Sequence, residues 1–587
     1  MCLLAACTAK NEAADGGSEP ETAVTVDAGA SASAASDLTG KPSAAKTKDE
    51  VPKDADTVNA QAEDIAFIRF FNVTQTEREV AKDNERAVVN ASFDVLTVEK
   101  TASDGETSLT ALSRKLSELE YNRNRDREAS FQEYTKRAST RNKQEKYDCD
   151  IQQSLSVLRA DTRVFSFLEE NVTTVDTAGA SPKEEEDTYA CTSYNLDAVN
   201  AKELRLKDVV KDPERLSELA AEAVLERYDT TNPAYNASLQ FEGIDLQERI
   251  LALLEDADAG TDGSFAWSPS YYGLRLIFSR KALCEEESLE AYLDEVSEIN
   301  PRDLNRFDVV VPYTAEPSLF EAAYTELPPS CIARLESGVT YLVDFGNGPE
   351  SLEIATPRKY ENNTVLYTGE CTVRLGENNK QSFDLIGAEE YGTLGVCVYL
   401  VKTEDAHYLY VDTTGRDETD RLHVYAIADK TVRFAGVSEE MLDNDRMPPF
   451  DPACFMAEGI FYILPDPFAA QNDTGTRGFR ESYVAPGGMP KSNERFYEAA
   501  EEDIRVTAID LTLDTLKDAD DDRPEKEIYK AGTSLTMWRV ERASHADLKA
   551  DDGRMVRLYI NGVDTIDLID GHELYEAFAD PRHEEDD

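Results

Sequence analysis

The stretch from Tyr189 to Leu196 is rich in aromatic and β-favouring residues, and its positions fall into two alternating sets: Tyr189, Cys191, Ser193 and Asn195, and Ala190, Thr192, Tyr194 and Leu196. This period of two predicts a strand. The stretch from Asp197 to Asn200 predicts a turn, because Asp and Asn side chains close turns on their own backbone. Lys202 to Leu206 then predicts a second short strand, so we expect a hairpin over 189–206.

The next segment changes to a helical period. Asp212 followed by Pro213 favours a helix start, since Asp caps the first turn and proline is preset for the first helical position. The apolar residues that follow share one helical face, namely Leu216, Leu219, Ala220, Ala223, Val224 and Tyr228. A second helix is expected over 246–256, a long polar one from Ser108 to about Arg137, and a short one over 317–324.

Most other apolar runs have the length of strands. The runs 408–412 and 421–427 predict a hairpin, and 533–540 and 554–561 are expected to pair with each other. The pattern therefore predicts an α+β protein with antiparallel sheets, a few packed helices and a β-rich C-terminal region. The remaining strand candidates are 87–98, 147–158, 164–171, 265–267, 272–278, 307–313, 340–345, 371–375, 396–402, 432–436 and 459–465.

The first sixty residues differ in composition from the rest. Leu4-Ala-Ala-Cys7 resembles the lipobox of bacterial lipoproteins, in which the cysteine carries the lipid, so we interpret 1–7 as a truncated lipoprotein signal; the alternative is a chance match. Residues 8–62 hold few large apolar side chains and predict a disordered tether. Together they predict a protein of the cell envelope, lipid-anchored at Cys7 or secreted.

The formal charge is 61 − 117 = −56. Such a surface argues against nucleic acid as a partner, because phosphates would be repelled. It also argues against contact with anionic lipid through basic patches, so we expect the membrane to be reached only through a lipid anchor. A basic protein partner suits this charge, and solubility alone also explains it. No apolar run approaches the roughly 18 residues that a membrane-spanning helix requires.

Several segments together resemble the extracytoplasmic domain that is shared by the lysozyme-sensing anti-sigma factors of Gram-positive bacteria and by a group of peptidoglycan deacetylases. They are Leu158-Arg-Ala-Asp161, Val164-Phe-Ser-Phe167, Tyr194-Asn-Leu-Asp197 with Lys202-Glu-Leu, Leu206-Lys-Asp-Val209, Gly273-Leu-Arg-Leu-Ile-Phe278 and the segment Val309 to Phe320. The resemblance implies a two-part α+β domain over 63–328. It also implies a ligand class, either peptidoglycan or a basic cell-wall hydrolase such as lysozyme.

The remainder, 329–587, is similar to the C-terminal part of uncharacterised surface proteins that carry the same domain pair. The chain departs from the family in two places. The family's Gly-Gly-Ala-His loop is replaced by 177–187, which contains no histidine, and the metal-binding Asp/His motifs of the deacetylases are absent from the sequence.

The cysteines are spaced without a C-x-x-C pair, which argues against a zinc site. In an exported protein they suggest disulfides, and we expect Cys149 to pair with Cys191 and Cys371 with Cys397. The alternative is buried free thiols.

Candidate metal sites are weak. A metal could be bound by His407 and His423, together with Asp412 or Asp420, if the two imidazoles face each other across the hairpin. We prefer the interpretation that both histidines lie on the surface, because no third ligand has the spacing that a site requires. The acidic loop 256–263 resembles a calcium loop, but Trp267 stands where a loop of that kind carries its last glutamate. We expect no metal and no cofactor.

The sequence contains none of the motifs G-x-S-x-G, H-E-x-x-H, G-x-x-x-x-G-K-[ST] and G-x-G-x-x-G. We therefore expect a non-catalytic binding or sensing module for a cell-wall component or a basic cell-wall hydrolase. The alternatives are a hydrolase with an acidic site in the C-terminal region and a structural envelope protein.

Overall fold

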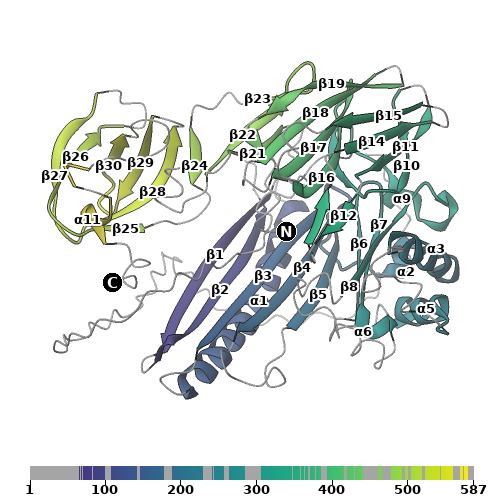
Figure 1. Cartoon of the computed structure of the whole chain (residues 1–587), viewed down its shortest axis with the longest axis horizontal. Coiled ribbons are helices and arrows are strands. Elements are labelled where there is room, and N and C mark those ends of the chain that lie inside the picture. The colour runs from purple at the N-terminus through teal and green to yellow at the C-terminus, as the bar shows by residue number, and fades with distance from the viewer. Residues whose placement is uncertain are drawn as a thin grey trace, which may run out of the picture. The chain divides into compact units, whose positions relative to one another are not determined.

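The structure is a computed structural model that describes residues between Ile65 and Ala579. Short breaks interrupt it, and the longest gaps are 99–107, 177–187, 229–240, 257–263, 285–305, 385–392, 442–459, 466–477 and 560–568. This part of the chain contains many antiparallel sheets and few helices, in agreement with the predicted α+β, β-rich class (Figure 1). The predicted signal and tether lie outside the described residues, as does the acidic loop 177–187.

The first sheet has five strands. In spatial order they are β1 (Phe70–Ala81), β2 (Asn84–Val98), β3 (Tyr147–Ala160), β4 (Val164–Asp176) and β5 (Thr188–Asp197). β2 and β3 run parallel, whereas the other pairs are antiparallel. A parallel pair needs a crossover connection, and helix α1 (Ser108–Thr140), which packs against the sheet, provides it (Figure 1).

Helix α1 is held to the sheet by a few apolar side chains on an otherwise polar helix. Leu112 and Leu116, one helical turn apart, pack with Phe165 and Leu196 of the sheet. Nearer the other end of the helix, Ala138 packs in a cluster of small residues and Tyr147. Each buried leucine stabilises the contact by about 2 kcal/mol, so a helix of low overall hydrophobicity is still fixed to the sheet.

A three-stranded antiparallel sheet follows, formed by β6 (Phe265–Pro269), β7 (Gly273–Ser279) and β8 (Arg306–Pro312). Its core is shared with α3 (Pro213–Arg227) and α5 (Leu246–Asp256), which supply Leu216, Val224 and Ile250. The predicted start of α3 is confirmed, because the Asp212 side chain accepts a hydrogen bond from the Arg215 backbone N–H at 3.0 Å. Loss of such a cap costs about 1 kcal/mol.

The predicted second strand of the hairpin at 202–206 is wrong. Only one isolated bridge forms there, between Leu196 and Glu203, and the chain turns into the short helix α2 (Leu206–Val209). The Asp208 carboxylate causes this turn, since it accepts hydrogen bonds from the backbone N–H and the guanidinium of Arg205.

The other short helices in this part of the chain lie close to the strands. α6 (Arg280–Leu283) follows β7 directly. The helix predicted over 317–324 is split into a 3-10 turn, η2 (Pro317–Leu319), and one helical turn, α9 (Ala322–Thr325).

Two further sheets share one core. A four-stranded sheet contains β10 (Thr340–Asp344), β11 (Pro349–Ala355), β14 (Glu370–Leu375) and β15 (Asn379–Asp384). A seven-stranded sheet contains β9 (Cys331–Leu335), β12 (Arg358–Glu361), β13 (Thr364–Tyr367), β16 (Thr393–Lys402), β17 (His407–Gly415), β18 (Asp420–Ala428) and β19 (Thr431–Ser438). Leu352 and Val373 of the first pack with Leu400 and Leu409 of the second, so the two sheets lie face to face. The predicted hairpin of β17 and β18 is confirmed.

The last sheet has twelve strands, and the short helix α11 (Leu574–Ala577) precedes its final strand. The expected pairing of 533–540 with 554–561 is wrong, because β29 pairs with β28 on one side and with β30 on the other, and so lies between them. The strands are β20 (Glu440–Met441), β21 (Ile460–Pro465), β22 (Gly478–Val484), β23 (Pro490–Lys491), β24 (Tyr497–Ala499), β25 (Ile504–Thr507), β26 (Leu511–Leu516), β27 (Glu525–Tyr529), β28 (Ser534–Glu541), β29 (His545–Ala550), β30 (Met555–Tyr559) and β31 (Phe578–Ala579).

Candidate binding site

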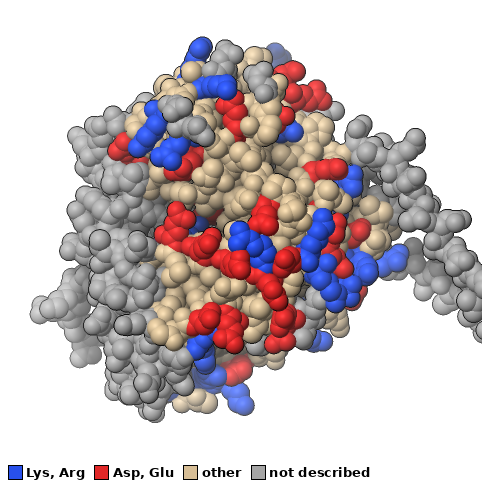
Figure 2. Space-filling view, turned by 90° about the vertical axis from the view of Figure 1, so that its right-hand side faces the viewer, with Lys and Arg blue, Asp and Glu red and all other residues tan. Residues whose placement is uncertain are grey.

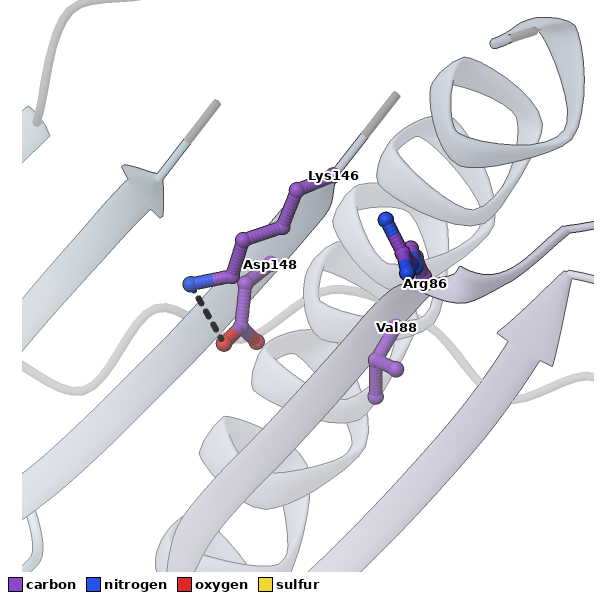
Figure 3. Close-up of a pocket in the computed structure, with 4 residues that line it drawn as sticks. All are labelled: Arg86, Val88, Lys146 and Asp148. Atoms are coloured by element: carbon purple, nitrogen blue, oxygen red, sulfur yellow. Dashed lines mark ion pairs between the residues drawn. The ribbon is translucent and has the colours of Figure 1, made fainter. Parts of the chain in front are cut away.

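An open hollow lies on the first sheet where β2 and β3 begin. Its volume is about 440 Å³, and it is lined by Arg86, Val88, Lys146 and Asp148. Figure 3 shows Arg86 and Val88 on one strand, with Lys146 and Asp148 on its neighbour. We call these four residues the cationic hollow.

The strand register explains why the four side chains share one face. Val88 is the partner of Asp148, and Ala87 is the partner of Tyr147. Ala87 and Tyr147 are buried in the cluster that includes Ala138 of α1. Because side chains alternate between the faces of a strand, the residues on either side of them point away from α1 and line the hollow.

Lys146 is the better-fixed cation of the hollow. Its ammonium nitrogen lies 2.6 Å from Asp176 Oδ2 and 3.9 Å from Asp148 Oδ2. The hydrogen bond that it donates to Asp176 raises the pKa of Lys146, which therefore stays protonated. Arg86 is exposed on the adjacent strand, one residue before the Ala87–Tyr147 pair, so the register places it next to Lys146.

Helices α3 and α5 turn carboxylates outward. We call their exposed acidic residues the acidic face: Glu214, Glu222, Glu226, Glu248, Glu255 and Asp256. Figure 2 looks from the side where Figure 1 draws these helices, and it shows Asp and Glu side chains gathered across the middle, with Lys and Arg among them.

The arginines of these two helices are occupied within the protein. Arg215 donates to Glu316 at 2.6 Å, and Arg227 donates to Glu336 at 2.9 Å. Arg249 donates to the carbonyl oxygen of Leu283 at 2.9 Å. These guanidinium groups are thus directed to internal acceptors, and the outward carboxylates keep their charge for an external partner.

A buried ion-pair network links the first sheet to the three-stranded sheet. Arg306 of β8 pairs with Glu170 of β4, and it also donates to the Tyr189 hydroxyl oxygen at 2.9 Å. Asp308 lies 3.5 Å from Arg306 and accepts two hydrogen bonds from Arg275, at 2.9 and 2.5 Å. The network joins β4, β5, β7 and β8.

Asp308 and Glu336 of this region remain ionised. Burial alone would raise the pKa of Asp308, but Arg275, Arg306 and Arg227 outweigh it and hold the pKa well below its usual range. The same balance of burial against neighbouring arginines lowers the pKa of Glu336 to about 2. These groups do not exchange protons near neutral pH, so we assign them a structural role.

The predicted disulfide between Cys149 and Cys191 does not form in the structure. Cys149 of β3 is opposite Val175, and Cys191 of β5 is opposite Glu170, so the two cysteines are separated by β4 and by 175 − 170 = 5 positions along it. Two strand spacings alone come to roughly 10 Å, beyond the roughly 7 Å that a disulfide allows between Cα atoms. Cys191 is a buried free thiol whose pKa burial raises to about 12.

The structure does not bring Cys371 and Cys397 together either. Cys371 lies in the core between the two face-to-face sheets. Cys397 of β16 packs on the opposite face of the seven-stranded sheet, with Tyr399 and Val401. Both are free thiols. The proposed lipid anchor, Cys7, lies outside the described residues.

The two histidines of the hairpin do not face each other. His407 is opposite Ile427, whereas His423 is opposite Val411, which separates them by 427 − 423 = 4 positions, or roughly 13 Å along the strand. Among the described residues no group of three His, Cys, Asp or Glu side chains has an arrangement that would hold a metal. Apart from Asp256, the calcium-like loop lies outside the described residues.

The hydrolase alternative requires a carboxyl with a raised pKa in the C-terminal region, because a general acid must be protonated at working pH. Four carboxyls in the described part of 329–587 have a lowered pKa, which is the opposite of this requirement: Glu336, Asp510, Asp552 and Asp570.

Sequence reasoning missed Arg86 and Lys146. A signal exists, since each cation stands just before an alternating strand pattern, Ala87-Val-Val and Tyr147-Asp-Cys. Only the parallel pairing across α1, however, places the two strand starts side by side.

Neither a family model nor a curated protein matches this chain. The solved structures that match include two bacterial members of the DUF3298 family. One, from Bacteroides fragilis, is 13% identical with a TM-score of 0.25, and the match covers 44% of this chain and 96% of that one. The other, from Pseudomonas aeruginosa, is 10% identical with a TM-score of 0.24, covering 43% of this chain and 95% of that one. At these scores the match establishes neither fold nor function, and the resemblance to the anti-sigma factor domain stays a prediction.

None of the helices that the structure describes is both long and apolar enough to cross a bilayer.

Proposed function

We propose that this chain is a non-catalytic binding module of the cell envelope, lipid-anchored or secreted, which binds a basic protein on its acidic face. A cell-wall hydrolase of the lysozyme kind has the required charge. The observation that carries the proposal is the outward charge of α3 and α5, whose arginines are engaged by internal acceptors. The formal charge of −56 on the whole chain acts in the same direction.

The helices suit this task because their inner sides are fixed. Leu216 and Val224 of α3 and Ile250 of α5 are buried in one core with the three-stranded sheet. A partner therefore meets carboxylates on a rigid support, which reduces the entropy lost on binding. Charge complementarity of this kind mainly raises the association rate, and salt weakens it.

A capture experiment tests the proposal. The immobilised full chain is exposed to lysozyme and, in a parallel arm, to purified peptidoglycan, each at low and at high salt. The proposal predicts capture of lysozyme at low salt and its release at high salt. Capture of peptidoglycan alone would replace the basic protein by a wall fragment as the ligand, and capture of neither would overturn the proposal.

A further inference from the structure

The turn between β22 and β23 packs on the seven-stranded sheet, and we call its residues, 485–489, the docked turn. The Ala485 backbone N–H donates to the Met489 carbonyl oxygen at 3.0 Å, which closes the turn. Met489 packs against a cluster that contains Tyr408 and Tyr410 of β17. These tyrosines lie on the face of the sheet opposite to the core that is shared with the four-stranded sheet. The contact involves neither α3 nor α5, so an inference about it goes beyond the proposed function.

The docked turn fits the sheet through two reciprocal close contacts. A Cβ atom at Gly488 of the turn would lie 2.3 Å from the Tyr408 ring. A Cβ atom at Gly436 of β19 would lie 2.8 Å from Met489 Sδ. The Tyr410 hydroxyl also donates to the Gly488 carbonyl oxygen at 2.5 Å. Each glycine therefore makes room for a side chain of the other partner, and the thioether lies against the β19 backbone, where an atom added to the sulfur would overlap it.

Met489 differs from a core methionine in its exposure. Its side chain is half-buried, whereas Met537 is only 4% exposed in the core of the last sheet. An oxidant in solution therefore reaches Met489 more readily. Oxidation to the sulfoxide makes this flexible apolar side chain polar and disrupts packing that depends on it. The contact of Met489 with apolar and aromatic residues of the sheet is packing of this kind.

We propose that Met489 is an oxidation-sensitive switch, which holds the docked turn on the seven-stranded sheet as the thioether and releases it as the sulfoxide. The oxidant is a peroxide. In this step Sδ gives up two electrons, the O–O bond of hydrogen peroxide breaks, an S–O bond forms, and the second oxygen atom leaves as water. Release uncovers Tyr408 and Tyr410, and methionine sulfoxide reductases reverse the change.

Peptide mapping and amide hydrogen exchange on the full chain test the proposal, with hydrogen peroxide as the oxidant. We expect the sulfoxide to form at Met489 at least tenfold faster than at Met537. We expect amide exchange in 478–491 to become at least tenfold faster after oxidation, because the docked turn has lost its support. Exchange in β28 and β29 should stay unchanged. Equal oxidation of the two methionines, or an equal rise in exchange across β28 and β29, would overturn the proposal.

Variants separate the effect of the sulfur from general oxidative damage. Met489→Leu keeps an apolar side chain of similar size but has no sulfur, so peroxide should leave its exchange in 478–491 unchanged. Met537→Leu is the matched control and should respond as the wild type does. Met489→Gln places a polar group at the same position, and we expect fast exchange of the docked turn without any oxidant. Release by peroxide in Met489→Leu, or exchange in Met489→Gln as slow as in the wild type, would overturn the proposal.

Discussion

Arg306 of β8 and Glu170 of β4 form a buried ion pair between two different sheets. The residues are 136 positions apart in the chain. Because the pair is shielded from water, the loss of one partner leaves the other charge buried without compensation.

We therefore expect Arg306→Met to lower the free energy of unfolding by about 3–5 kcal/mol. The control is Arg163→Met, which removes the exposed pair with Glu326 at 3.2 Å and should cost at most about 1 kcal/mol. Urea unfolding followed by circular dichroism measures both variants. Equal losses in the free energy of unfolding would show that the buried pair stabilises the fold no more than the exposed pair does.

Glycine is required at position 488. A Cβ atom there would lie 2.3 Å from the Tyr408 ring, in a backbone with φ of +98°. Gly487 has nearly the same φ, +99°, but nothing within 4 Å of its Cβ position. We expect Gly487→Ala to cost about 1 kcal/mol for the backbone alone, and Gly488→Ala to cost about 1–3 kcal/mol more because the ring must move. Thermal melts of the two variants compare them directly, and identical melting temperatures would refute the steric explanation.

Acid should weaken the sheet around His407. Burial, followed by the charge of Lys402, lowers the pKa of His407 from 6.5 to about 4. As the pH falls, His407 therefore gains a proton in the unfolded chain before it does so in the folded protein. The contribution of this difference to the free energy of unfolding is complete above about pH 6.5 and is lost as the pH falls towards 4. We expect an effect of about 1–2 kcal/mol, reduced from the full shift because part of the ring reaches solvent.

Urea unfolding midpoints between pH 7 and pH 4 measure this effect. His407→Leu should flatten the dependence, whereas His572→Asn serves as a control and should leave it as it is in the wild type. An unchanged pH profile in His407→Leu would contradict the assignment.

The thiols should be unreactive in the folded protein. Burial raises the pKa values of Cys191, Cys331 and Cys371 to about 12, so little thiolate is present at neutral pH. We expect iodoacetamide to modify these residues only after unfolding. No reductant should be needed, because the thiols are free and no disulfide has to be reduced first. A peptide map that shows Cys149 linked to Cys191 would contradict the structure.

Local chemistry made part of the fold predictable. The Asp212 cap, the apolar face of α3 and the strands β17 and β18 follow from neighbouring residues, and the structure has them where the sequence pattern places them. Alternation alone does not determine which strands are neighbours. The insertion of β4 between Cys149 and Cys191, and the parallel meeting of Arg86 with Lys146, both depend on the order of strands in the sheet.

The acidic face was only partly predictable for a similar reason. The net charge is evident from the composition. The arginines of the two helices, however, donate hydrogen bonds to acceptors that are distant in the sequence. The pairs are Arg215 with Glu316, Arg227 with Glu336, and Arg249 with the carbonyl oxygen of Leu283. Only the folded arrangement shows which charges remain outward.

The affinity of the full chain for lysozyme at low salt, measured by biolayer interferometry in matched charge variants, tests the central claim most directly. The test variant carries Glu222→Gln, Glu226→Gln and Glu248→Gln. The control carries Glu370→Gln, Glu404→Gln and Asp405→Asn, which remove the same charge from exposed positions outside α3 and α5. The account predicts that the Kd of the helix variant is at least tenfold higher than that of the wild type, a loss of about 1.4 kcal/mol of binding free energy. It predicts little change in Kd for the control. Equal Kd values for the two variants would contradict it.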